Sequence, residues 1–257
     1  MSCFQSPTSV AAALLALTFS LGAHAEEHAH WSYNDHAGTG PSHWGALDPD
    51  SRLCKTGLQQ SPIALHTRGA KHLSDRDIAL HFGTAKGELV NNGHTIQFNV
   101  ADATTNAVAY KGVSYALAQF HFHTPSEHRL DGRSFPMEMH LVNKDANGKI
   151  TVVGVFIKQG KKNAALAGLW DQLPASDAAP KAGEVDLAAL LPVSHKAMVY
   201  AGSLTTPPCS EEVNWIVMEQ PIEMSHQQIR TFQKLFRDNH RPLQREHGRK
   251  VLEESAM

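Results

Sequence analysis

The sequence predicts a sheet-dominated α+β fold in a single domain, with a few peripheral helices. Short runs rich in β-branched and aromatic residues recur between clusters of Gly, Pro, Asn and Asp, which is the pattern of strands separated by turns. No repeat, long charge block or low-complexity linker divides residues 26–257. The chain has 257 residues, of which 42% are hydrophobic, and is therefore long enough to bury one large core.

The strand pattern is clearest in six runs. They span Thr95 to Val100, Ser114 to His123, Pro136 to Val142, Ile150 to Ile157, Lys196 to Tyr200 and Val213 to Met218. Helical signals are fewer. Ser225 and Gln228 have the spacing of a capping box, and apolar residues follow at intervals of three and four. A second helix is predicted over 163–173, where one side would carry Leu166, Leu169, Trp170 and Leu173.

The N-terminus has the features of a secretory signal peptide, residues 1–25. This segment has no Asp, Glu, Lys or Arg, and the apolar run from Val10 to Leu21 ends near the triplet Ala23-His24-Ala25. The run of about 12 residues is shorter than the roughly 20 that span a bilayer as a helix, so a membrane anchor is the weaker alternative. The segment departs from the usual pattern in lacking an N-terminal Lys or Arg. We expect cleavage before Glu26 and a periplasmic or extracellular mature protein.

The overall charge excludes some classes of partner. Twenty-three basic and twenty-five acidic side chains give a net charge of -2, so no global field attracts nucleic acid or an anionic membrane. A small neutral or singly charged substrate suits this balance.

Two cysteines remain after the signal peptide, Cys54 and Cys209. An even pair in an oxidising compartment suggests one disulfide. Two buried free thiols are the alternative.

Histidine is unusually frequent, with 17 residues, and three of them have a pattern suited to metal binding. In a strand, His121 and His123 share a face with Gln119, whereas Phe120 and Phe122 take the other face. His28 and His30 have the same spacing, but their polar surroundings favour solvated side chains.

His140 is the third candidate ligand, because it shares a strand face with Glu138 and Val142. If the two strands are antiparallel neighbours, three imidazoles can converge. Gln119 and Glu138 each precede a candidate ligand by two residues and could accept its second ring N–H. Three neutral imidazoles favour zinc, one per chain, and leave a fourth position in which water is acidified to hydroxide near neutral pH.

Beyond these histidines, the sequence resembles the alpha-class carbonic anhydrases of the bacterial, secreted type. The matching segments are Ser61-Pro62-Ile63 after Gln60, Asn92-Gly93-His94, Gln119 through His123, Ser126-Glu127-His128, Glu138-x-His140, Gly202-Ser203-Leu204-Thr205-Thr206-Pro207-Pro208, Trp215 and Asn239-x-Arg241-Pro242. Two residues depart from animal relatives: Phe122 stands in place of a Trp, and Gln97 in place of an Asn.

The resemblance implies a mixed, mostly antiparallel sheet of about ten strands and a conical cavity that ends at zinc. It implies the reversible hydration of carbon dioxide to bicarbonate and a proton by attack of zinc-bound hydroxide. Sulfonamides and anions are the expected inhibitors. Bacterial relatives are often dimers, so a homodimer is possible.

The resemblance also implies roles for particular residues. Thr205 would accept a hydrogen bond from the hydroxide and donate one to Glu127, which orients the oxygen lone pair toward the substrate carbon. Thr206 would contact bicarbonate, and His94 would be the proton shuttle. The apolar wall around carbon dioxide would consist of Val142, Val152, Leu204 and Trp215. Tyr33, Asn92, Gln97 and Asn239 would complete the water network and the surroundings of the ligands.

Two other classes of protein fit part of the pattern. The spacing His121-x-His123-x-x-x-Glu127 also occurs in cupin-type metal enzymes, where Glu127 would be a ligand and iron or manganese the metal. The glycine and the second motif typical of cupins are missing. A noncatalytic zinc-binding or carbohydrate-binding module on the same fold is the other alternative, although such modules typically lose a ligand histidine.

Overall fold

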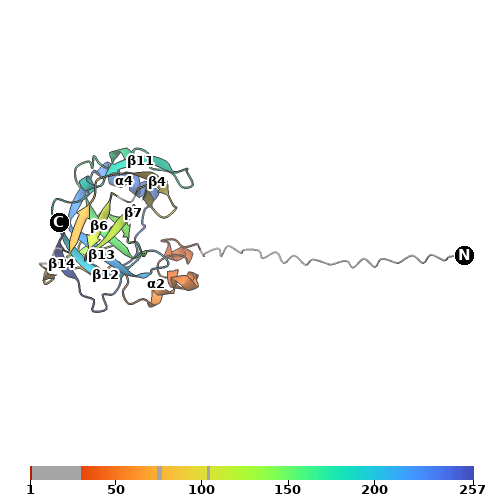
Figure 1. Cartoon of the computed structure of the whole chain (residues 1–257), viewed down its shortest axis with the longest axis horizontal. Helices are drawn as coiled ribbons and strands as arrows, with labels where there is room; N and C mark the ends of the chain where they lie inside the picture. Colours follow the sequence, from red (N-terminus) through yellow and green to blue (C-terminus); the bar gives the residue numbers. More distant parts are fainter. Residues whose placement is uncertain (2–29, 74–76, 103–104) are drawn as a thin grey trace.

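The fold is built around one large β-sheet (Figure 1). A computed structural model describes residues 1, 30–73, 77–102 and 105–257. The predicted signal peptide falls, apart from Met1, outside the described residues. In this described part of the chain, no helix is long and apolar enough to cross a membrane.

Twelve strands form the large sheet in the described residues. Its main path runs in the order β11 (Lys181–Asp186), β4 (Thr84–Asn91), β5 (Ile96–Val100), β7 (Val113–His123), β9 (Met137–Lys144), β10 (Ile150–Gln159), β13 (Glu211–Met224), β12 (Lys196–Ser203), β14 (Leu252–Ser255) and β2 (Lys71–His72). Beside this path, β6 (Ala107–Tyr110) pairs with β7 and β3 (Ile78–His81) pairs with β6. A separate two-stranded sheet joins β1 (Ala64–Leu65) to β8 (Arg129–Leu130).

Most neighbouring strands of the large sheet are antiparallel, while β10 pairs with β13 and β14 with β2 in parallel. The prediction of a mixed, mostly antiparallel sheet is therefore confirmed, with twelve strands instead of about ten. All six predicted strands are present. β13 extends furthest beyond its predicted end at Met218, because the ladder with β10 continues past an irregularity between Val155 and Ile157. That break in register accommodates Pro221, whose missing N–H would otherwise argue against a strand.

Helices are few and short. They are α1 (Trp44–Leu47), α2 (Leu53–Thr56), α3 (Ala167–Trp170) and α4 (His226–Leu235), with 3-10 helices η1 (Asp35–Ala37), η2 (Pro49–Arg52) and η3 (Ala188–Leu190). The capping box of α4 is formed as predicted: Ser225 Oγ accepts from the Gln228 backbone N–H, and Gln228 Oε1 accepts from the Ser225 N–H.

The helix predicted over 163–173 is wrong in extent, since only the single turn of α3 forms. Gly168 lies in the middle of that turn and has a low helix propensity. Pro174 disfavours a helical conformation for Leu173, which precedes it. The apolar side chains Leu166, Leu169 and Trp170 nevertheless pack into the core.

The two faces of the sheet bury different cores. Phe120 and Phe122 of β7 are fully buried in the larger core, where Phe122 contacts Trp170 of α3 at 4.9 Å between ring centroids. Phe232 of α4 packs into the same core. The smaller core, on the opposite face, contains Trp215 and other residues of β9, β10, β12 and β13. The alternation in β7 therefore directs its histidines toward the smaller core.

A disulfide joins α2 to the loop between β12 and β13, as the sequence analysis expects. Cys54 and Cys209 have Cα atoms 5.0 Å apart. The Cys209 backbone N–H donates to the carbonyl of Thr206, which ties the disulfide to the loop that carries Thr205 and Thr206. The bond thus anchors this loop to a segment 155 positions away in the sequence.

Replacing both cysteines, in the variant Cys54→Ser/Cys209→Ser, should lower the free energy of unfolding. For a sequence separation of 155 the chain-entropy model gives a loss of about 5 kcal/mol, an upper value because strain in the native state usually reduces it. Urea unfolding of the mature chain and of the variant measures the difference. Thiol titration of the denatured mature chain without reductant is the companion test, and two free sulfhydryls would contradict the bond.

Candidate metal centre

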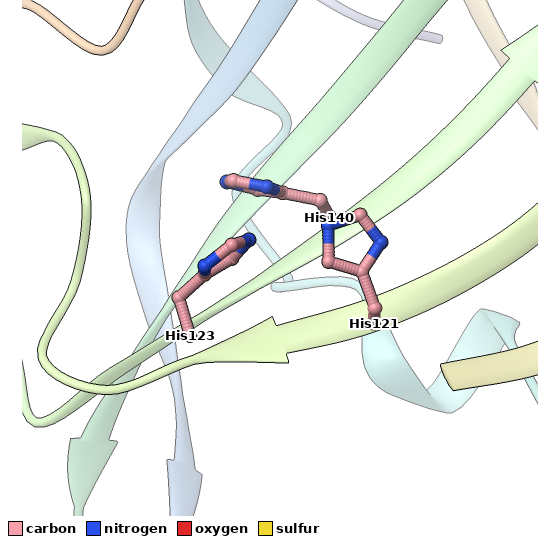
Figure 2. A group of neighbouring side chains, drawn as sticks. All are labelled: His121, His123 and His140. Carbon is pink, nitrogen blue, oxygen red and sulfur yellow. The ribbon is translucent and has the colours of Figure 1, made fainter. Parts of the chain in front are cut away.

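Three histidines on two neighbouring strands turn their rings toward a common space (Figure 2). In the antiparallel register of β7 and β9, His121 lies opposite His140, and His123 follows two residues along β7 on the same face. The ring centroids are 4.6 to 5.3 Å apart. One nitrogen of each ring lies within 4.8 Å of the others. This spacing can be bridged by one ion with ligand distances of about 2 Å.

Each of the three rings has one nitrogen committed to a hydrogen-bond acceptor. The bonds run from His121 Nδ1 to Gln119 Oε1 (2.8 Å), from His123 Nδ1 to the backbone oxygen of Asn239 (2.7 Å), and from His140 Nε2 to Glu138 Oε1 (2.8 Å). Because all three acceptors lack a proton, each imidazole must donate from that nitrogen. The opposite nitrogens, Nε2 of His121 and His123 and Nδ1 of His140, are left with free lone pairs.

Burial disfavours the charged form of two of these rings, His121 and His123. It lowers the pKa of His121 well below its ordinary value, and the neighbouring rings of His123 and His140 lower it further. Burial also lowers the pKa of His123. Nε2 of His123 is buried without a hydrogen-bond partner among the described residues. A buried lone pair without a partner is costly, and a cation held between the three nitrogens would satisfy it.

Glu138 links the centre to a buried polar chain. Its Oε1 accepts from His140 and also from His128 Nδ1 at 2.7 Å, while its Oε2 accepts from the His128 backbone N–H at 2.9 Å. The chain continues from His128 Nε2 to the Tyr200 hydroxyl (2.7 Å), which donates to Ser61 Oγ (2.8 Å). Burial alone would raise the pKa of Glu138, but its electrostatic interactions and hydrogen bonds with His128 and His140 outweigh the effect of burial and hold the pKa well below its ordinary value.

This chain explains a second group of possible metal ligands, His128, Glu138 and His140. The atoms of that group already satisfy one another by hydrogen bonds, so it does not require an ion. His128, Tyr200 and Ser61 had no role predicted from the sequence. The only sequence signal for His128 is its place in the Ser126-Glu127-His128 segment.

Only one carboxylate oxygen of Glu127 has a hydrogen-bond partner among the described residues. Its Oε1 accepts from the Arg241 backbone N–H at 2.8 Å, whereas Oε2 has no hydrogen-bond partner within the described part of the chain. The hydrogen bond expected from Thr205 to Glu127 is therefore not formed in the structure. Burial lowers the pKa of Arg241 to about 10, so its guanidinium stays charged at neutral pH. That guanidinium donates to Gln60, to Ser61 and to the carbonyl of Cys54.

A cavity of about 240 Å³ lies beside His121 and His140. The sequence analysis predicted six substrate-contacting residues, and all six line this cavity: Val142, Val152, Leu204, Thr205, Thr206 and Trp215. Gln119 also lines it. The wall therefore combines an apolar surface with two hydroxyl groups that lie next to each other in the chain.

His94 lies in a turn outside the lining of this cavity. Its half-buried ring stacks on Trp31 with 3.6 Å between centroids and an interplanar angle of 8°. Asn92 Oδ1 accepts from the backbone N–H groups of His94 and Thr95, so its oxygen shapes the turn.

The other residues predicted for the water network are dispersed. Gln97 lies opposite His121 in the pairing of β5 with β7, but its side chain donates to Asn99 at 2.7 Å. Tyr33 lies close enough to Glu127 for the two to interact electrostatically. Burial, and then the charge of Glu127, raise the pKa of Tyr33 well above its ordinary value.

Asn239 connects the candidate ligands to the turn of His94. Besides its backbone contact with His123, its side-chain nitrogen donates to the carbonyls of His94 (3.0 Å) and Phe122 (2.9 Å). Its side-chain oxygen accepts from the Thr124 N–H at 2.7 Å. The residue is 1% exposed, so these contacts are shielded from water.

The comparisons with known proteins agree with this fold and site. Residues 39–255 match the eukaryotic-type carbonic anhydrase family. A carbonic anhydrase of Pectobacterium carotovorum is 40% identical over 241 residues, which cover 93% of this chain and 96% of that protein. One from Klebsiella pneumoniae is 41% identical over 227 residues, covering 87% and 91% of the two chains.

The solved structures give the same result. The alpha-carbonic anhydrase from Thermovibrio ammonificans, in complex with the inhibitor sulfanilamide, has a TM-score of 0.83 and 41% sequence identity over 87% of this chain and 99% of that chain. The chain belongs to the eukaryotic-type, or alpha-class, carbonic anhydrase family. This membership confirms the resemblance and excludes the cupin alternative.

Replacing any one of His121, His123 or His140 by Ala should abolish stoichiometric metal binding, because two imidazoles neither hold an ion tightly nor fix its geometry. Equilibrium dialysis with zinc followed by elemental analysis measures the bound metal. His36→Ala, a change at an exposed histidine of the N-terminal segment, is the matched control and should retain about one zinc per chain. Full zinc occupancy in any of the three variants would overturn that residue's assignment as a ligand.

Proposed function

We propose that this chain is a secreted zinc enzyme that reversibly hydrates carbon dioxide to bicarbonate and a proton. One observation carries the proposal. Three buried imidazoles donate their ring protons to fixed acceptors, so their free lone pairs converge beside a largely apolar cavity. Family membership supports the same activity.

Zinc suits this donor set because all three ligands would be neutral nitrogens, with no thiolate or carboxylate among them. His121, His123 and His140 would hold one ion per chain. When bound there, zinc would lower the pKa of a coordinated water to about 7, the established effect in carbonic anhydrases, and so supply hydroxide at neutral pH.

The cavity wall would hold carbon dioxide without competing water. Val142, Val152 and Trp215 are at most 7% exposed, and with Leu204 they present hydrocarbon and indole surface to the cavity. An apolar surface favours an uncharged linear molecule and disfavours the charged product. Thr206 lines the same cavity and would contact bicarbonate through its hydroxyl.

Thr205 and Glu127 would orient the nucleophile. The Arg241 backbone N–H holds one oxygen of Glu127, and the other remains available to accept a hydroxyl proton. A Thr205 hydroxyl that donates to this carboxylate oxygen can only accept from its other neighbour. The bond is absent from the structure, so we expect it to form when the centre is loaded.

His94 would carry the proton away. A hydronium ion recombines with a deprotonated group at no more than about 10^10 per molar per second. A group of pKa about 7 therefore loses its proton directly to water at only about 10^3 per second. Carbonic anhydrase turnover reaches about 10^6 per second and therefore needs an intermediate acceptor. An imidazole can accept and release a proton near neutral pH. Tyr33, Asn92 and Gln97 would order the water between the centre and His94.

We further assign residues 1–25 as the signal peptide and 26–257 as the catalytic domain, which places the enzyme in the periplasm or outside the cell. The apolar N-terminal run and the disulfide support this location. Sulfonamides and small anions would inhibit the enzyme by occupying the metal centre. We also propose a homodimer, which analytical ultracentrifugation would test.

A stopped-flow assay of carbon dioxide hydration by the zinc-loaded chain tests the function, with Val142→Tyr as the informative variant. A phenol ring at this position would fill the cavity, so kcat/KM should fall about a hundredfold while bound zinc stays constant. The matched control is Val193→Tyr, because Val193 is 95% exposed, and it should behave like the wild type. Sulfanilamide should inhibit the wild type. Bound zinc without hydration would favour a noncatalytic zinc-binding module instead.

His94→Ala should lower kcat about tenfold or more in dilute buffer, and concentrated imidazole should largely restore it, while kcat/KM changes little. The reason is that the shuttle serves proton release and not the attack on carbon dioxide. The same assay measured against buffer concentration gives both constants. An unchanged kcat in dilute buffer would rule out this role in a wild type that turns over faster than about 10^3 per second.

A further inference from the structure

Two rings from one distant segment lie against His94. Trp31 lies parallel to the His94 ring, and the imidazole of His30 is 5.9 Å from it between centroids, tilted by 32°. His94 is half-buried, whereas His30 is exposed. The two histidines therefore form a pair in which His94 lies in the partly buried turn and His30 lies at the solvent.

We propose that His30 is an outer proton acceptor, which takes the proton from His94 and passes it to buffer. The inference rests on the proposed hydration activity. It differs from the sequence-based expectation, in which His30 is merely a solvated side chain.

The stacking geometry gives the reason for a second acceptor. Trp31 covers one face of the His94 imidazole and thereby limits the directions from which buffer can approach the ring. At 5.9 Å between centroids, one water can join a nitrogen of His94 to a nitrogen of His30. His30 is exposed and gives the proton a second place from which to leave.

The hand-off moves one proton and no electrons. Protonated His94 gives its N–H proton to the unprotonated nitrogen of His30 through the bridging water, and His94 returns to the neutral form. His30 then gives its proton to a buffer base. Both residues end each cycle as they began it.

Electrostatics favour outward transfer. Burial lowers the pKa of His94, and the charge of His30 lowers it further. His94 therefore gives up a proton more readily than a free imidazole does. Among the described residues, the others in contact with His94 are Trp31 through its ring, Asn239 through the His94 carbonyl and Asn92 through the His94 N–H, and all three are uncharged.

The test compares His30→Ala, His30→Gln, His94→Ala and the double variant His30→Ala/His94→Ala, each produced as the full chain and loaded with zinc. Carbon dioxide hydration is followed by stopped flow in dilute buffer and in concentrated imidazole, across the pH range in which histidine titrates. His36→Ala is the matched control, because His36 is an exposed histidine of the same segment whose ring does not contact His94 among the described residues.

Both His30 variants should lower kcat about threefold in dilute buffer, with kcat/KM unchanged and with recovery in imidazole. The midpoint of the pH profile of kcat should move upward, since removing the charge of His30 lets the pKa of His94 rise. In the His94→Ala background, loss of His30 should add nothing, because His30 receives its protons from His94.

Three results would overturn the proposal: an unchanged kcat in dilute buffer, an equal loss in the His94→Ala background, or a loss in His30→Ala that His30→Gln does not share. The last result would mean that His30 only supports packing of Trp31. A wild type that does not hydrate carbon dioxide would instead contradict the proposed function. Normal kcat/KM together with an effect of His94 but none of His30 would leave that function intact and remove only this inference.

Discussion

A shift of one residue between β7 and β9 would turn His140 into the larger core and bring Leu141 to the cavity, because successive side chains of a strand point to opposite faces. The register is held by burial on both sides. Phe120 and Phe122 are fully buried on one face, while His123 and Glu138 are at most 1% exposed on the other. The convergence of the three imidazoles thus follows from the same packing that stabilises the sheet.

The hydrogen-bond acceptors of the histidines connect these two strands to other parts of the sheet. Glu138 lies on the strand of His140, but its second contact is with His128, which leads to Tyr200 on β12. Through this chain the tautomer of one imidazole depends on a strand beyond β10 and β13 in the sheet order. Buried polar networks of this kind stabilise when every member is satisfied, and they are costly when one member is lost.

The sequence predicted the parts of the fold that repeat locally. Alternation in β7 and β9 placed the histidines on one face, and the spacing of Ser225 and Gln228 identified the start of α4. The predicted helix over 163–173 was wrong in extent, because the spacing of apolar residues does not include the local effects of Gly168 and Pro174. The acceptor for His123 could not be derived from residue type, since it is a backbone carbonyl 116 positions away. The contact of Trp31 with His94 likewise depends on tertiary structure alone.

The side chain of Asn239 has consequences for how freely this position can change. It needs one acceptor for the Thr124 N–H and two donors for the carbonyls of His94 and Phe122, all within one short amide. Aspartate has the same shape but would set a negative oxygen against two carbonyl oxygens. Glutamine would displace the amide by one methylene in a site that is only 1% exposed. Neither substitute preserves all three contacts. This position should therefore tolerate almost no substitution.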